Sequence, residues 1–205
     1  MAESIFNLVF QQEDLKSKIV VALERISEVF RALLWEHAKT IGLSPIQIQI
    51  LIFTAYHQES LRNVSYLAKE FNVTKPTISD AVRVLEKKGL ISKHTAAYDH
   101  RRYSIALTEA GEAMVRETEH FAEPIKAQLQ SFSADQLSTF HTQLIELIAR
   151  LNRRGILSEQ RTCHSCRYFQ KSGQAAYCKL MQKPLLADDI RLDCPEFDSA
   201  LQNNV

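Results

Sequence analysis

The chain has 205 residues, a formal net charge of +1, 45% apolar residues and 24% charged residues. This composition is ordinary for a globular protein with one domain and a small appendage, or with two small domains. Five Gly and five Pro are too few for a loop-rich all-β protein, and no apolar run approaches the roughly 18 residues of a membrane-spanning helix. The N-terminus lacks the basic segment and apolar run of a secretory signal, so we expect a cytoplasmic protein with reduced thiols.

A long helix is predicted from Leu15 onward, because apolar residues recur there at intervals of three and four with no Gly or Pro before Gly42. Ser44 and Pro45 then begin a second, buried helix, "IQIQILIFTAYH", with Ser44 as the N-cap residue. The first helix could belong to a monomeric helical bundle. Its length exceeds the core it could cover within one chain, which favours a dimer, and we assign residues 1–44 to an N-terminal dimerisation region.

A helix-turn-helix is predicted next, from a short helix "SYLAKEF", a turn "NVT" and a second helix that Thr74 caps and Gly89 ends. The second helix places Ile78, Val82 and Leu85 on one face, which we expect to be buried. Its opposite face carries short hydroxyls and cations near the helix start, the end of a recognition helix that enters the major groove. These exposed candidates are Lys75, Thr77, Ser79, Asp80 and Arg83.

After this helix, apolar and polar residues alternate with a period of two. The segments "LISKHT" and "YSIAL" are therefore predicted to form the strands of a wing around the hairpin "AAYDHRR". Arg101 and Arg102 in this hairpin could reach phosphates or the adjacent minor groove. Residues 62–103 hold nine Lys or Arg and four Asp or Glu, a local positive excess in a nearly neutral chain. Helix-turn-helix geometry also packs ordinary cores, but the wing and the local charge together favour a DNA-binding domain over residues 45–108.

Further helices are predicted after the wing. The segment "TEAGEAMVRETEHFAEPIKAQLQ" has a helical pattern that Pro124 should kink or break, and a capping box at "SADQ" begins a striped helix that Gly155 ends. We assign residues 109–155 to C-terminal dimerisation helices. The expected fold is therefore mainly α with a small β-wing, in which helical dimerisation regions flank a winged helix-turn-helix domain. The apolar stripe of the last helix is Leu137, Phe140, Leu144, Leu147 and Leu151.

All four cysteines of the chain lie in its tail, which we assign as a separate module over residues 156–205. Their spacing is C-x2-C-x11-C-x15-C. Two disulfides are disfavoured in a reducing compartment, whereas four thiolates can complete a tetrahedral metal site or bind one four-iron cluster. Zinc sites more often use two C-x2-C pairs, and here only the first pair has that spacing. The proposed ligands are Cys163, Cys166, Cys178 and Cys194.

The segments "LAKEFNVTKPTISDAVRVLEKKGLI" and "DHRRYSIALTEAG" resemble a MarR-family winged-helix regulator, and the order of elements from about residue 10 to 152 is similar too. The resemblance implies a homodimer that binds a palindromic operator in double-stranded DNA. It also implies which side chains of the second helix read the major groove. They are Lys75, Thr77, Ser79 and Arg83.

The same resemblance assigns the wing. It implies that Arg101 at the wing tip enters the minor groove and that Asp99 orients this arginine. Asp80 departs from the family pattern, in which a basic or neutral residue is commoner. It could pair with Arg83 or accept a hydrogen bond from a cytosine amine, and the sequence leaves both possibilities open.

The tail "CHSCRYF…YCKLMQKPL…CPEF" resembles high-potential iron–sulfur proteins over about 35 residues, although the intervals differ and the Gly-Trp before the last Cys is absent. Cys194 is followed by Pro195, as in cluster-binding runs, and apolar residues surround the cysteines in sequence. These features favour a [4Fe–4S] cluster over zinc. His164 could substitute as a ligand, although a solvated His in a tight turn is the simpler interpretation.

No G-x-S-x-G, phosphate-binding loop or motif-placed pair of carboxylates is present, so the sequence does not predict an enzyme. It predicts a dimeric DNA-binding transcriptional regulator. In the favoured interpretation, the [4Fe–4S] cluster modulates operator binding in response to redox state or iron supply. In the alternative, the tail is a structural zinc module with four cysteine ligands, and a small-molecule effector is sensed elsewhere in the protein.

Overall fold

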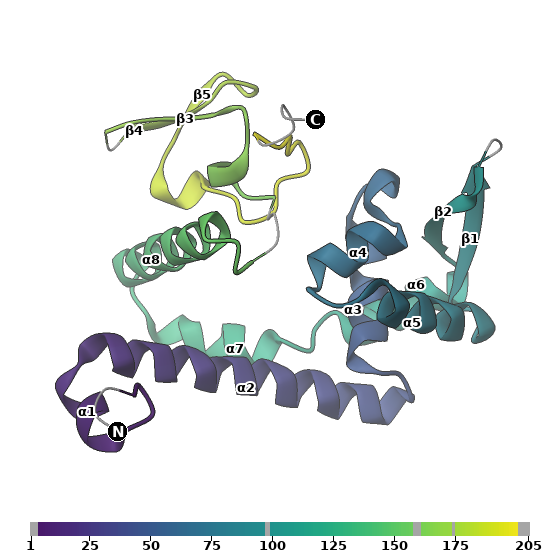
Figure 1. The fold of residues 1–205 in the computed structure, drawn as a ribbon, viewed down its shortest axis with the longest axis horizontal. Helices are drawn as coiled ribbons and strands as arrows, with labels where there is room; N and C mark the ends of the chain where they lie inside the picture. Colours follow the sequence, from purple (N-terminus) through teal and green to yellow (C-terminus); the bar gives the residue numbers. More distant parts are fainter. Residues whose placement is uncertain (1–3, 97–98, 158–160, 174, 201–205) are drawn as a thin grey trace.

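The structure is a computed structural model that describes residues 4–200 except 97–98, 158–160 and 174, and gives no side chains between 95 and 102. The described chain is mainly α-helical with a two-stranded wing, as the sequence predicts, and it has a second small antiparallel sheet in the tail (Figure 1). Its α-helices are α1 (Leu8–Glu13), α2 (Leu15–Ile41), α3 (Pro45–Tyr56), α4 (Val64–Glu70), α5 (Lys75–Lys87), α6 (Glu109–Thr118), α7 (Glu123–Gln128) and α8 (Ala134–Arg153). Its strands are β1 (Ile91–Ala96), β2 (Asp99–Leu107), β3 (Phe169–Ser172), β4 (Ala175–Cys178) and β5 (Lys183–Leu185).

Local capping signals place the ends of the long helices. Gly42, with φ of 66°, ends α2 in the left-handed conformation, and the capping box of Ser44 and Gln47 begins α3. A second capping box at Ser133 begins α8. The predicted break before Pro124 is confirmed, because α6 and α7 are separate helices. The short helix α1 was not predicted.

The core of the winged domain surrounds α3. Ile48, Ile50 and Leu51 are completely buried, although they point in different directions around the helix. Partners reach them from every side, because a helix that is apolar all round must be covered all round. The covering residues include Leu34 and Ala38 of α2, Leu67 of α4, Ile78, Val82 and Leu85 of α5, Ile105 of β2 and Val115 of α6.

The wing is an antiparallel hairpin in which Ile91 of β1 pairs with Leu107 of β2. The Ile105 amide donates to the Arg62 carbonyl oxygen at 2.8 Å, which ties the hairpin to the segment before α4. The strands are longer than the sequence predicts, because β2 already begins at Asp99. The backbone that was assigned to the hairpin loop therefore belongs largely to a strand.

The tail folds into a three-stranded meander with the order β3-β4-β5, which the sequence did not predict. It is followed by a single 3-10 turn, η4 (Ala187–Asp189), which lies against α8. The Ser138 hydroxyl of α8 donates to Asp188 Oδ1 at 2.7 Å. The module therefore rests on the last long helix, above it in the view of Figure 1.

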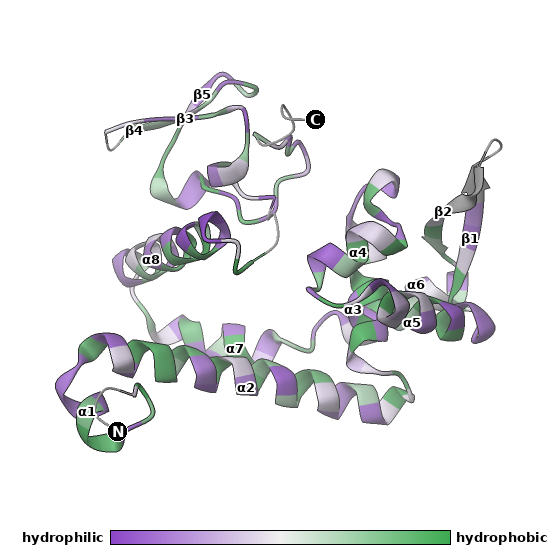
Figure 2. Ribbon diagram, viewed as in Figure 1, coloured by the Kyte–Doolittle hydropathy of each residue, from purple (hydrophilic) through white to green (hydrophobic). Residues whose placement is uncertain are grey.

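Helix α2 extends away from the winged domain and carries hydrophobic residues along its length (Figures 1 and 2), and several of these side chains are exposed. Ile26 is 50% exposed and Phe30 is 43% exposed, and Phe140 on α8 is 47% exposed. Exposed large apolar residues gathered in this way often mark a surface that another protein covers. The exposed apolar residues of α2 and α8, here Ile26, Phe30 and Phe140, are called the apolar arm below. Among the described helices, none combines the length and the apolarity that crossing a membrane requires.

Substitution of Gly111 by Ala tests the packing of α6 against the turn before the wing. A Cβ at this position would lie 2.0 Å from the Leu90 carbonyl oxygen, a backbone atom that cannot move aside cheaply. We expect Gly111→Ala to lower the free energy of unfolding by about 3 kcal/mol, in the range of overpacked sites. The measurement is urea unfolding followed by circular dichroism. Glu112→Ala, at the adjacent exposed position, should stay within about 0.5 kcal/mol of wild type. Equal stability of the two variants would contradict the close approach.

Candidate functional site

The first candidate surface is the outer face of α5. Thr74 caps this helix by accepting a hydrogen bond from the Thr77 amide, and Ile78, Val82 and Leu85 are completely buried beneath it. Their burial fixes the rotation of α5, so the opposite side chains point to solvent. All five candidates from the sequence are exposed there, as expected. They are Lys75, Thr77, Ser79, Asp80 and Arg83.

Asp80 pairs with Arg83 in the structure, which decides between the two possibilities for the chain without DNA. Arg83 Nη2 donates to Asp80 Oδ1 at 2.7 Å, and both side chains are mostly exposed. An exposed pair of this kind contributes little, typically about 0–1 kcal/mol. Arg83 can therefore leave Asp80 for a DNA acceptor at small cost.

The wing carries the other predicted DNA contacts. The backbone of Asp99, Arg101 and Arg102 lies in β2. Their side chains lie outside the described residues, so the orientation of Arg101 by Asp99 remains a prediction. The contacts of β2 with α3 and α6 place this backbone in the same domain as α5 (Figure 1).

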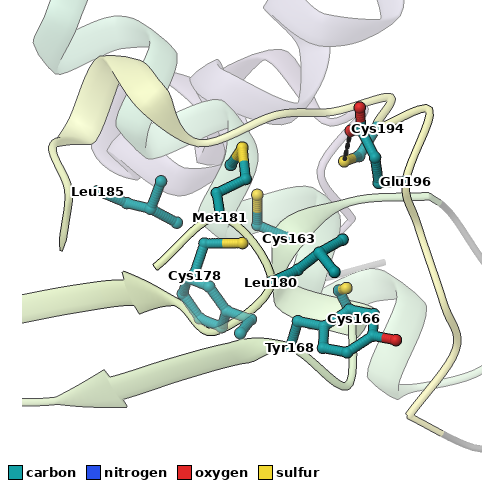
Figure 3. Close-up of a pocket in the computed structure, with 10 residues that line it drawn as sticks. Cys163, Cys166, Tyr168, Cys178, Leu180, Met181, Leu185, Cys194 and Glu196 are labelled. Atoms are coloured by element: carbon teal, nitrogen blue, oxygen red, sulfur yellow. Dashed lines mark hydrogen bonds between the residues drawn. The ribbon is translucent and has the colours of Figure 1, made fainter. Parts of the chain in front are cut away.

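The second candidate site is a small cavity in the tail (Figure 3). The four cysteines reach it from different elements: Cys163 from the 3-10 turn η3 (Cys163–Ser165), Cys166 from the residue after it, Cys178 from the end of β4 and Cys194 from the segment after η4. The Cys166 amide donates to the Cys163 carbonyl oxygen at 3.1 Å, a tight turn that keeps the first pair together. The other lining residues are Tyr168, Phe169, Leu180, Met181, Leu185 and Glu196.

Arg191 provides hydrogen-bond donors to two of these sulfurs. Its amide donates to Cys163 Sγ at 3.3 Å, and its Nη1 lies 3.6 Å from Cys194 Sγ. The Cys194 thiol in turn donates to Glu196 Oε2 at 3.4 Å. Donors of this kind stabilise a thiolate and are the usual surroundings of sulfur ligands. The sequence did not single out Arg191, although its position three residues before Cys194 was a possible signal.

Burial controls the protonation of the two most enclosed thiols. It raises the pKa of Cys163, against the opposing effect of the Arg191 amide, and it also raises the pKa of Cys194. Both groups are therefore protonated at neutral pH in the free chain. Binding of a metal or cluster would displace these protons, because the thiolate is the ligand.

The number and sequence spacing of the cysteines suit a cluster, but the cavity that they line is too small to hold one as it stands. Among the described residues, no group of three or more His, Cys, Asp or Glu is arranged to hold a metal ion. The sulfurs thus surround the cavity without converging on one point, whereas a single zinc needs all four within about 2.3 Å of itself. The cavity measures only about 20 Å³, room for one water. A cluster therefore requires neighbours such as Leu180, which is 45% exposed, to swing outward.

His164 lies outside the thiol cavity. Its ring packs edge-on against Phe169 at 5.0 Å and lines a different cavity, between the module and α8. Burial, followed by the charges of Lys171 and Arg153, lowers the pKa of His164. The structure therefore favours the interpretation of His164 as a packed side chain over its use as a fifth candidate ligand.

Comparison with known proteins agrees with the geometry of the winged domain. The model of the MarR family matches residues 41–102. The matched segment contains the helix-turn-helix of α4 and α5 and the first part of the wing, so this part of the chain is similar to the MarR family. The MepR–DNA complex of S. aureus is 25% identical with a TM-score of 0.57, and covers 64% of this chain and 97% of its own. The transcriptional regulator PA3341 is 25% identical with a TM-score of 0.58, and covers 66% of this chain and 99% of its own.

These two structures are matched over nearly their whole length, whereas about a third of the present chain has no counterpart in them. The four-cysteine module has no support from these matches. Its interpretation depends on the chemistry of its own residues.

Proposed function

We propose that this MarR-type chain is a DNA-binding transcriptional regulator, that it acts as a homodimer, and that its tail binds a [4Fe–4S] cluster whose presence modulates DNA affinity. The observation that carries the DNA-binding part is α5. It presents exposed hydroxyls and cations at the capped start of the second helix of a helix-turn-helix. One of the similar structures, MepR, is a complex with DNA.

A second copy of the chain is the expected cover for the apolar arm. Ile26 and Phe30 of α2 and Phe140 of α8 leave apolar surface exposed on the helices assigned to dimerisation. Two reading helices in one dimer would contact two half-sites, and a palindromic operator follows from the two-fold symmetry. We expect this regulator to work in the reducing cytosol, where free thiols persist.

The tail is the expected sensor. Four free cysteines line one cavity with an apolar shell, and Arg191 donates to two of the sulfurs. A bound cluster would supply redox and iron sensitivity. The chain's own part is to hold the thiolates and to exclude water. Because η4 of the module contacts α8, loss of the group would change the packing of the module on a dimerisation helix, and with it the spacing of the half-site contacts.

Substitutions on α5 test DNA reading. The probe is a duplex that the wild-type protein selects from a random-sequence pool, and the measurement is affinity at several salt concentrations. We expect Arg83→Ala to cost about 1–3 kcal/mol and to relax the selected sequence, since a base contact is lost. Lys75→Ala should reduce the slope of log affinity against log salt by about one. Lys126→Ala on α7 is the charge-matched control and should change neither. An Arg83→Ala protein with unchanged affinity and selection would refute this role for α5.

A charge on the apolar arm tests the dimer. Phe30→Glu places a carboxylate where we expect the partner's apolar surface, and it should convert the dimer to a monomer at micromolar concentration. Sedimentation velocity measures this conversion. Lys87→Glu introduces the same carboxylate on the winged domain and should leave the dimer intact. A Phe30→Glu protein that remains dimeric would exclude this part of α2 from the interface.

Anaerobic purification tests the thiol site. We expect a brown protein with broad visible absorbance, about four irons and four sulfides per chain, and bleaching in air. Cys166→Ser should abolish the absorbance and change the affinity for the selected duplex. His164→Ala is the matched control in the same turn and should retain the absorbance, because His164 lies outside the cavity.

Zinc without iron in the purified protein would contradict the cluster and support the alternative interpretation. In that interpretation the four cysteines hold a structural zinc ion, and an effector is sensed elsewhere. A protein that binds neither metal would reject both interpretations of the tail. A Cys166→Ser protein that loses its metal but keeps its DNA affinity would reject the sensor.

A further inference from the structure

Arg161 connects the cysteine module to the helix-turn-helix. It lies two residues before Cys163, and only 7% of it is exposed. Its Nη1 donates to Glu70 Oε2 at 2.9 Å and to the Tyr66 hydroxyl, both on α4. Its guanidinium carbon lies 5.2 Å from the centroid of the Phe53 ring and 5.6 Å from that of Tyr66. One buried cation therefore contacts the first helix of the helix-turn-helix and the end of α3.

The same guanidinium also binds Asp193, which lies next to Cys194 in the later part of the module. Its Nε donates to Asp193 Oδ1 at 2.6 Å and its Nη2 donates to Asp193 Oδ2 at 2.9 Å, a bidentate pair. Asp193 Oδ2 also lies 2.7 Å from His57 Nε2, and Gln58 Nε2 donates to the Pro195 carbonyl oxygen at 2.8 Å. The end of α3 is thus joined to the residues on both sides of Cys194.

Two segments of the module, residues 161–163 and 191–194, are joined to each other by backbone hydrogen bonds. The Cys194 amide donates to the Arg161 carbonyl oxygen at 3.0 Å, and the Cys163 amide donates to the Arg191 carbonyl oxygen at 3.1 Å. Each segment therefore carries at least one cysteine of the cavity and one member of the Arg161–Asp193 pair. A group that bridges Cys163 and Cys194 would fix the separation of the two segments.

We propose that the Arg161–Asp193 pair transmits the state of the thiol site to α4, and through α4 to the DNA-reading helix α5. This inference rests on the proposed function in one respect, namely that the thiols bind a metal or cluster. Arg161 is a positioning residue, since it does not line the thiol cavity. Its buried guanidinium is shared between the module and α4, which gives the physical connection that coupling would use, and the experiment below tests for the two states that coupling requires.

Charge and burial explain why the pair is sensitive to small movements. Burial disfavours the charged form of Arg161, yet its hydrogen bonds to Asp193, Tyr66 and Glu70 outweigh that effect and raise its pKa. If Asp193 withdraws, the buried cation keeps, among the described residues, one of its two carboxylate partners, Glu70. The guanidinium and α4 must then adjust, since a buried charge that loses a partner is costly.

The experiment compares four proteins, each as isolated and after removal of its metal by a chelator. They are the wild type, Arg161→Lys, Glu70→Gln and the control Arg167→Lys. Lys cannot reproduce the bidentate fork, and Gln removes the charge of Glu70 while the module's own Arg161–Asp193 bonds remain. Arg167 lies in the same module and pairs with Asp198 at 3.2 Å, but it is 56% exposed. Metal content and circular dichroism establish that each variant is folded and loaded.

Two readouts are measured on each protein: amide hydrogen exchange over residues 64–70, and affinity for the duplex selected by the wild type. We expect metal removal to change both by about tenfold in the wild type and in Arg167→Lys, a typical size for coupling between sites. In Arg161→Lys and Glu70→Gln the change should fall below about twofold, with metal content unaltered.

The outcomes separate the coupling from the regulator function. If exchange in α4 responds to metal removal but duplex affinity does not, the coupling to α4 stands, whereas its continuation to α5 and the sensor function both fail. If exchange in α4 is the same before and after removal, or if both variants respond like the wild type, the inference is overturned. If the protein holds no metal, alkylation of the pocket thiols supplies the perturbation, and the same differences between variants are required.

Discussion

Complete burial of α3 is the constraint on which the rest of the winged domain depends. Ile48, Ile50 and Leu51 have no exposed surface, and each contributes about 1.5–3 kcal/mol through burial. Because they point around the helix, α2, α5, α6 and β2 must all pack against it. The rotation of α5 is fixed by that packing, and so is the set of side chains it presents to solvent. The last turn of α3 then carries Phe53, on which the His57 ring stacks at 3.7 Å, beside the contact with the cysteine module.

Local chemistry made most of the helical framework predictable. A capping box needs only two side chains three residues apart, and both boxes of the long helices α3 and α8 lie where the sequence placed them, at Ser44 and Ser133. The two ends of α5 have similar local causes. At its start the Thr74 side-chain oxygen accepts from a free amide, and after its end Gly89 tolerates a φ of 71°. The inward face of α5 followed from its spacing alone. Features that depend on neighbours in sequence could therefore be predicted from the sequence by itself.

Features that depend on distant partners could not be predicted in this way. Nothing in the neighbouring sequence distinguishes Arg161 from the other cations of the chain, because its partners Glu70 and Tyr66 are brought to it by the fold. The strands of the tail are three or four residues long, too short to show an alternating pattern, and their pairing comes from the turns between them. The four cysteines were predicted to share one site, and they line one cavity, but their spacing could not specify which atoms surround each sulfur.

The position of the module gives its two contacts a common consequence. On one side η4 rests on α8, where Ser138 donates to Asp188, and Ser165 donates to Asn152 Oδ1 at 3.3 Å near the end of the same helix. On the other side Arg161 holds α4. The module thus spans a helix assigned to dimerisation and a helix that supports DNA reading. In a two-fold dimer, the separation of the two reading helices depends on the angle between such elements. A small change in how the segments around the thiols are held would act on that angle through both contacts at once. This is a physical reason why the proposed sensor would lie here rather than at the far end of α2.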